Sequence, residues 1–195
     1  AGVRDAANLA WKLDLVRRGI APDTLLDTYQ SERLPSARAA IEFSIELGKV
    51  ICVPDPAEAA ARDAAMAAAV DGIAAAPGLP DITTGLIHPT APHAGTQLVQ
   101  GRVDGRLADD VHGNGWRLVL HGIDVDDLGD EEREWFASFG AVLALTQPDP
   151  VFDRWFADHA TGCALQRPDF YLYGTAPDAA TATALLADLR RELTS

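Results

Sequence analysis

The stretch from Ala1 to Leu13 reads AGVRDAANLAWKL, and the rest of the chain is best understood from it. Its apolar residues recur at the spacing of one helix face, so we expect a helix that buries Val3, Ala6, Ala10 and Leu13. The first turn of such a helix has backbone N–H groups without helical partners, which suit an anionic or carbonyl-rich ligand. No Met and no strand precede this helix, so we expect the chain to begin inside a larger fold.

Two strings near the start of the chain resemble one known family. They are Asp5-Ala6, Asn8-Leu9 and Trp11-Lys12-Leu13 in the first helix, followed by Tyr29, Glu32, Arg33, Pro35 and Ala37 in the pattern Y-x-x-E-R-x-P-x-A. They resemble the helix after the flavin-contacting loop, and the segment next to it, of the FAD-dependent aromatic hydroxylases (group A flavoprotein monooxygenases). The 3-(3-hydroxyphenyl)propionate hydroxylase type is the most similar. This resemblance implies that Ala1 and Gly2 are cofactor-binding residues beside the flavin pyrimidine ring.

The same resemblance implies an activity for a larger parent protein. Members of that family hydroxylate a phenolic compound with NAD(P)H and O2, and the FAD carries the chemistry. The G-x-G-x-x-G loop that holds the nucleotide half of FAD does not occur in this sequence. We find no residue to assign as a catalytic acid or base. We therefore expect the C-terminal part of a flavin-dependent monooxygenase, inactive when isolated and without a bound cofactor.

Polar residues of these two strings have a structural interpretation as well. Asp5 and Asn8 are expected to hold the start of the first helix or to be ordinary polar positions there. Glu32 and Arg33 are expected on a solvated helix face, with Tyr29 in helix packing.

Composition excludes several kinds of partner. The chain of 195 residues has a formal net charge of −13 and a pI near 4.6, which argue against nucleic acid and against an anionic membrane surface. Charged residues interrupt the Ala-rich stretch 57–76, so no segment is apolar enough to cross a bilayer. We expect a cytoplasmic protein whose partner is a phenolic small molecule, and the sequence leaves a homodimer open.

The expected fold is of the α/β class, with a helical N-terminal segment and a thioredoxin-like domain that lacks the C-x-x-C motif. Residues 1–76 would form the helical tail of the FAD and substrate-binding domain, 77–96 a Pro- and Gly-rich linker, and 97–195 the C-terminal domain. Within the tail, Pro35 is expected to kink or split the second helix, and Asp55 to cap a third helix that reaches about residue 75.

Short strands alternate with helices after residue 97. Strands are expected at 98–100, 116–121, 141–146, 164–167 and 170–174, and helices at 132–139, 150–159 and 177–193. The strands at 116–121 and 141–146 would be parallel, and the last two would form a hairpin around Pro168-Asp169. The strings from Gly101 to Leu120 and from Arg167 to Ala176 also resemble the C-terminal domain of the hydroxylases.

Thiol and metal chemistry lack a complete set of residues in the sequence. Cys52 and Cys163 are far apart and are expected to be buried free thiols. The acidic residues 124–130 lack the ligand spacing of a calcium loop, and His88 with His93 makes an incomplete metal site. Two alternatives stay open: a stand-alone, redox-inactive thioredoxin-like module for interaction or dimerisation, and a thiol oxidoreductase if the two cysteines meet.

Overall fold

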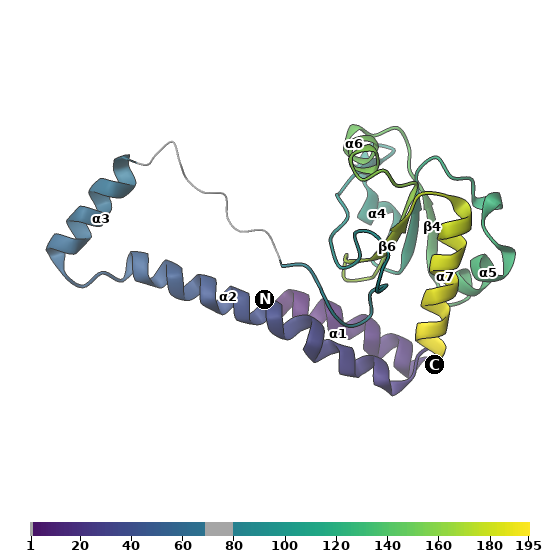
Figure 1. The fold of residues 1–195 in the computed structure, drawn as a ribbon, viewed down its shortest axis with the longest axis horizontal. Helices are drawn as coiled ribbons and strands as arrows, with labels where there is room; N and C mark the ends of the chain where they lie inside the picture. Colours follow the sequence, from purple (N-terminus) through teal and green to yellow (C-terminus); the bar gives the residue numbers. More distant parts are fainter. Residues whose placement is uncertain (1, 69–79) are drawn as a thin grey trace. The chain divides into compact units, whose positions relative to one another are not determined.

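The computed structural model describes residues 2–68 and 80–195, and its ribbon is drawn in Figure 1. The contacts divide the chain into two units. One unit combines Gly2–Arg33 with Asp81–Ser195, and the other runs from Leu34 to Pro80, of which residues 69–79 lie outside the described part. The first helix therefore belongs to the same unit as the C-terminal sheet.

A four-stranded sheet is the centre of the larger unit. It consists of β3 (Arg117–Leu120), β4 (Val142–Leu145), β5 (Cys163–Gln166) and β6 (Leu172–Ala176), in the spatial order β4-β3-β5-β6. Strands β3 and β4 are parallel, whereas β5 is antiparallel to both β3 and β6. The predicted parallel pair and the predicted hairpin around Pro168-Asp169 are thus confirmed, and the chain is of the mixed α/β class.

Helices cover both faces of this sheet. One face packs against α1 (Gly2–Arg17), α5 (Asp130–Ser138) and α7 (Ala179–Thr194), and Figure 1 shows α5 and α7 together on one side of the strands. The other face packs against α4 (Ala108–His112) and α6 (Pro150–Asp158). Alternate residues of each strand serve the two faces because successive side chains point to opposite sides of a sheet. The predicted helices at 132–139, 150–159 and 177–193 are confirmed within a few residues.

The remaining elements of this unit are short. They are the 3-10 turns η1 (Asp23–Asp27) and η3 (Val125–Asp127) and the two-stranded ladder of β1 (Arg102–Val103) with β2 (Arg106–Leu107). The predicted strand at 98–100 is wrong, since only a single bridge joins Gln97 to Tyr171 at this point. A run of three residues is too short for alternation to separate a strand from an extended loop.

Residues 81–96, which we call the edge segment, run along the outer strand β6. The backbone N–H of Leu172 donates to the Thr96 carbonyl at 2.8 Å, and that of Thr175 donates to the Pro92 carbonyl at 3.1 Å. Gly95 has a positive φ of 80°, and a Cβ there would lie 1.7 Å from the backbone oxygen of Ile82. The segment covers strand groups that would otherwise be an exposed sheet edge. Gly95, one of the residues that predicted a linker, therefore permits tight packing instead. The predicted domain boundaries stay a prediction.

Helices α2 (Thr28–Ile51) and α3 (Pro56–Ala68) come from the early part of the chain. The predicted split at Pro35 is wrong, because α2 is one helix with the proline inside it, whereas the predicted kink stays a prediction. Proline leaves the carbonyl four residues earlier without its helical donor, and the hydroxyl of Thr84 donates to that Ser31 oxygen at 3.2 Å. The predicted cap of α3 is confirmed by the Asp55 carboxylate, which accepts from the N–H of Ala57 at 2.8 Å. The predicted continuation from residue 69 to residue 75 lies outside the described residues.

The predicted buried face of α1 is wrong. Val3 is 87% exposed and Leu13 is 46% exposed, whereas α1 buries Asn8, Trp11, Lys12 and Leu15. Small alanines gain little from burial, so a large aromatic side chain decides the orientation of the helix more than a row of Ala residues does. Two polar residues share the buried face because they find charged partners on other segments, as described below.

Large aromatic side chains fill much of the core. Trp116, Trp155 and Phe136 are 3%, 7% and 0% exposed. In the described parts of the chain, no helix is long and apolar enough to cross a membrane.

Candidate functional site: a buried ionic cluster

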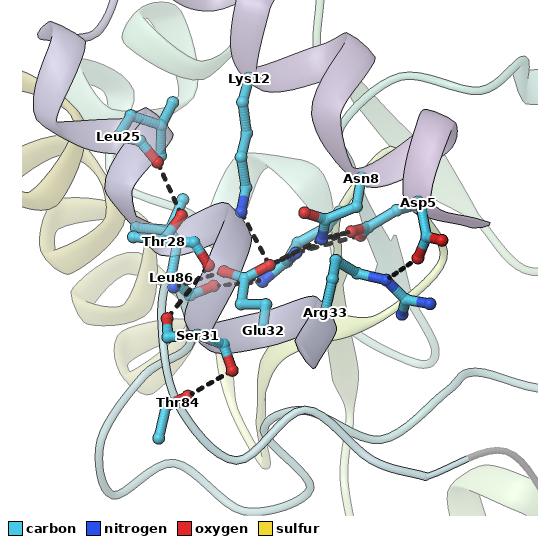
Figure 2. Close-up of polar contacts among 12 residues, drawn as sticks. Asp5, Asn8, Lys12, Leu25, Thr28, Ser31, Glu32, Arg33, Thr84 and Leu86 are labelled. Atoms are coloured by element: carbon cyan, nitrogen blue, oxygen red, sulfur yellow. Dashed lines mark hydrogen bonds and ion pairs between the residues drawn. The ribbon is translucent and has the colours of Figure 1, made fainter. Parts of the chain in front are cut away.

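Five polar side chains from three distant segments meet inside the larger unit, and we call them the ionic cluster. Asn8 and Lys12 come from α1, Glu32 from α2, and Arg167 and Asp169 from the turn between β5 and β6. Figure 2 shows Lys12 and Asn8 extending from α1 toward Glu32. All five residues are at most 6% exposed. The cluster contains two cations and two anions, so its formal net charge is zero.

Arg167 uses every N–H of its guanidinium group. Nε donates to Oδ1 of Asp169 at 3.0 Å, and Nη2 donates to Oδ2 of Asp169 at 2.7 Å and to Oε2 of Glu32 at 2.6 Å. Nη1 donates to Oε1 of Glu32 at 3.2 Å and to the carbonyl of Leu86 at 2.8 Å. A planar fork with five donors can hold two carboxylates with two hydrogen bonds each, which an ammonium group with three donors could not do.

Glu32 is the acceptor shared by the whole cluster. Besides Arg167, its Oε1 accepts from the backbone N–H of Leu86 at 2.8 Å, and its Oε2 accepts from Nδ2 of Asn8 at 2.7 Å. Gly85 has a positive φ of 94°, and a Cβ there would lie 2.4 Å from the Glu32 side chain, so glycine is required for this approach. Glu32 thereby ties α2 to the edge segment as well as to the β5–β6 turn.

Asn8 and Lys12 attach α1 to the cluster. Nδ2 of Asn8 bridges the carboxylates of Glu32 and Asp169, at 2.7 and 2.6 Å. Nζ of Lys12 forms a fully buried ion pair with Oε2 of Glu32 at 2.9 Å. Neither Nζ of Lys12 nor Oδ1 of Asn8 has a hydrogen-bond partner within the described residues. The contact of Lys12 is therefore mainly electrostatic, and the directional bonds come from Asn8.

The electrostatics of the cluster favour ionised carboxylate and guanidinium groups. Burial alone would raise the pKa of Glu32, but the nearby charge and hydrogen bonds of Arg167 outweigh it and lower that pKa to about 2. Burial lowers the pKa of Lys12 to about 8, with Glu32 opposing the shift. Burial would lower the pKa of Arg167, yet Asp169 and Glu32 raise it above its ordinary value. A carboxylate this strongly held is a poor proton carrier near neutral pH, so the cluster is suited to positioning.

Aromatic packing closes the cluster on the side of the sheet. The Arg167 guanidinium carbon lies 5.2 Å from the Trp11 ring centroid, and Trp11 meets Trp116 edge to face at 5.5 Å. These contacts exclude water and stabilise the cluster in addition to its ion pairs. A second ion pair, between Arg33 and Asp5 at 2.9 Å, joins α2 to the first turns of α1.

The structure therefore corrects two predictions. Glu32 and Arg33 do not lie on a solvated face, since each is 3% exposed. Asn8 does more than hold a helix start, because it bridges two buried carboxylates. All five cluster residues lie in strings that resemble the hydroxylase family, namely D-A-x-N-L-x-W-K-L, Y-x-x-E-R and R-P-D, so the sequence did single them out. What sequence could not show is that these strings meet.

The predicted cofactor-binding residues lie at the start of α1. Ala1 is outside the described residues. Gly2 is the first residue of α1 and is exposed, and nothing lies within 4 Å of the position that a Cβ would take.

The other candidate residues do not assemble into a site with three ligands. Within residues 2–68 and 80–195, no group of three or more His, Cys, Asp or Glu could hold a metal ion. Asp124 instead accepts from the N–H of Asp126 at 3.0 Å. Cys163 is buried, but Cys52 is exposed, so the prediction of two buried thiols is wrong for Cys52. Burial raises the pKa of the Cys163 thiol to about 12, which makes it unreactive.

Comparison with solved structures shows the class of fold. The chain is similar to the OxyS anhydrotetracycline hydroxylase from Streptomyces rimosus, with a TM-score of 0.66 and 23% identity, over 98% of this chain and 40% of that one. It is also similar to the flavin-dependent monooxygenase PieE in complex with FAD and substrate, with a TM-score of 0.67 and 20% identity, over 97% of this chain and 44% of that one. The fold is one found within flavin-dependent monooxygenases.

Comparison with the sequences of known proteins shows which flavin-dependent monooxygenases the chain is related to. The profile of a family described as "FAD binding domain" matches residues 1–44. The chain is 41% identical to a probable NADH-specific resorcinol 4-hydroxylase of Rhodococcus jostii (strain RHA1), over 99% of this chain and 38% of that protein. It is 35% identical to a 3-(3-hydroxy-phenyl)propionate/3-hydroxycinnamic acid hydroxylase of Mycobacterium sp. (strain JLS), over 93% of this chain and 40% of that protein. The chain belongs to the family of FAD-dependent aromatic hydroxylases and spans about two fifths of the length of these relatives.

Proposed function

We propose that the chain is the C-terminal part of an FAD-dependent aromatic hydroxylase that uses NAD(P)H and O2 to hydroxylate a phenolic compound in the cytoplasm. The observation that carries this proposal is the 41% identity with a resorcinol hydroxylase across 99% of the chain. The match of residues 1–44 to an FAD binding domain supports a role of the first helix near the cofactor. A stand-alone interaction module has no comparable support.

The start of α1 would lie at the edge of the flavin site. Ala1 and Gly2 would contact the pyrimidine ring, with backbone N–H groups of the first helical turn facing its carbonyl oxygens. The FAD would supply the redox and oxygen chemistry, and this chain would contribute orientation and exclusion of water.

The ionic cluster would act as a positioning device for that helix. Asn8 and Lys12 tie α1 to Glu32, and Arg167 ties Glu32 to the turn of the sheet. A helix held at two successive turns, by the hydrogen bonds of Asn8 and by the buried ion pair of Lys12, has little freedom to rotate, which would keep Gly2 at a fixed place. The exposed side chains of Val3 and Leu13, on the opposite face of α1, support a larger protein in which further residues cover them.

We also propose the domain division 1–76, 77–96 and 97–195, with a thioredoxin-like last domain that has no redox motif. The strand order β4-β3-β5-β6 supports this assignment. So do the parallel first pair, the antiparallel hairpin and the closing helix α7. Cys163 lies within a strand and is buried, which supports a domain without thiol chemistry.

The test compares the 195-residue chain with the longer protein encoded by its gene. The purified chain should be colourless and should not oxidise NADH in the presence of resorcinol or 3-(3-hydroxyphenyl)propionate. The longer protein should carry FAD in a one-to-one ratio, oxidise NADH or NADPH when a phenol is present, and yield a hydroxylated product by mass spectrometry. A yellow chromophore bound tightly to the short chain, or a longer protein without flavin, would contradict the proposal.

A further inference from the structure

A cavity of about 310 Å³ lies between α7, β6 and the edge segment, away from the ionic cluster. The edge segment forms one wall because the backbone N–H of His88 donates to the Tyr173 carbonyl at 2.9 Å. Gly174 makes this close approach possible, since a Cβ there would lie 2.6 Å from the Cβ of Ala91. The cavity is therefore a product of the fold, and none of its lining residues belongs to the proposed flavin edge.

Asp188 supplies a buried acceptor at one side of the cavity. The residue is 9% exposed, and its Oδ2 accepts from the hydroxyl of Tyr173 at 2.6 Å. Its Oδ1 forms an ion pair with Arg191, which fixes the orientation of the carboxylate. Oδ2 keeps the capacity to accept a further hydrogen bond.

His88 supplies a donor opposite that acceptor. Its Nδ1 accepts from the backbone N–H of Ala91 at 2.8 Å and of Thr90 at 3.2 Å, so the ring proton is on Nε2. Burial and the charge of Arg191 lower the pKa of His88, which keeps the ring neutral. Nε2 lies 3.7 Å from Oδ2 of Asp188, too far for a hydrogen bond but a span that one oxygen atom can bridge at about 2.8 Å from each.

The ligand chemistry follows from this pair of groups. A hydroxyl group can accept from Nε2 of His88 and donate to Oδ2 of Asp188 at the same time. A carboxylate would be repelled by Asp188, and an ammonium group would offer nothing to the His88 donor and would face Arg191. The side chains of Pro92, Ala184 and Leu185 line the cavity and suit an apolar body.

We propose that this cavity binds a small, uncharged, hydroxyl-bearing apolar compound, an alcohol or a phenol, with its hydroxyl between His88 and Asp188. The site is separate from the proposed flavin site and does not depend on the proposed activity.

Phenol is the first probe, titrated into the 195-residue chain, with benzene as the matched compound without a hydroxyl. Two-dimensional NMR should show saturable shifts at the amides of Ala91 and Leu185. Benzene should bind about tenfold more weakly, because it cannot bridge the donor and the acceptor. Shifts that do not saturate, or equal affinities for phenol and benzene, would overturn the proposal.

Two variants test the geometry. Ala184→Trp fills the cavity from an exposed helix position and should abolish phenol binding, whereas Ala157→Trp, at an exposed position on α6, should leave it unchanged. His88→Asn keeps an acceptor for the edge-segment N–H groups and loses the Nε2 donor, so phenol affinity should fall about fivefold and benzene affinity should stay. Phenol binding that survives Ala184→Trp, or that is indifferent to His88→Asn, would refute the assigned site.

Discussion

Replacement of Arg167 by Met tests whether the ionic cluster holds the larger unit together. Methionine has a similar length and keeps packing against Trp11, but it removes the charge and all five donors. Glu32 would keep its hydrogen bonds from Asn8 and from the Leu86 N–H. The cluster would then contain two buried carboxylates but only one positive charge, that of Lys12. A buried charge that loses its partner typically costs about 3–5 kcal/mol of unfolding free energy. We expect Arg167→Met to cost this much.

The assay is urea unfolding of the 195-residue chain followed by tryptophan fluorescence. Trp11 is one of four tryptophans, and its ring lies 5.2 Å from the Arg167 guanidinium carbon, so part of the signal comes from the cluster. Arg154→Met is the matched control, because Arg154 is 84% exposed and its pair with Asp158 is 3.4 Å long. That control should change stability by less than about 0.5 kcal/mol.

A double-mutant cycle separates charge pairing from packing. Glu32→Gln removes the negative charge that Arg167 neutralises, so the double variant should lose less than the sum of the two single losses, by about 1–3 kcal/mol. A loss below about 1 kcal/mol for Arg167→Met, or strictly additive single losses, would show that the cluster is not a coupled unit and would refute this reasoning.

Further predictions concern acid stability, the edge segment and the thiols. Because the pKa of Glu32 falls from 4.5 to about 2 on folding, its contribution of about 3 kcal/mol is present above pH 4.5 and is lost as the pH falls toward 2, and Glu32→Gln should flatten that part of a stability curve measured by urea unfolding. Gly95→Ala should cost about 3 kcal/mol or more, against about 1 kcal/mol for Gly105→Ala, which has a similar positive φ but open space; equal losses in thermal unfolding would contradict the packing argument. Ellman's reagent should label Cys52 in the native chain and Cys163 only after denaturation, and rapid labelling of both would disprove the burial.

Local patterns were sufficient for most of the sheet. The strands around Val119 and Ala144 are short apolar runs bounded by Gly and Asp, and the hairpin turns at Pro168-Asp169, so their existence and order could be predicted. The cap of α3 by Asp55 was equally predictable, because an Asp-Pro pair before a run of Ala is a local signal for a helix start.

The face of α1 could not be predicted in this way. Periodicity counts apolar positions equally, so Val3, Ala6, Ala10 and Leu13 outweighed Lys12 and Asn8. Burial of a lysine costs several kcal/mol unless a partner is present, and the partner here is Glu32, which a separate helix supplies. A pattern read from one helix contains no information about that partner.

The sequence by itself determined the alternation of strands and helices, the family and the strings that carry its resemblance. Only the tertiary structure decided that three of those strings meet in one neutral cluster, and that the Pro- and Gly-rich residues 81–96 lie along β6. The physical reason is the distance along the chain over which each kind of interaction acts. Secondary structure follows from neighbours within a few residues, whereas a buried ion pair between Glu32 and Arg167 depends on residues 135 positions apart that only folding brings together.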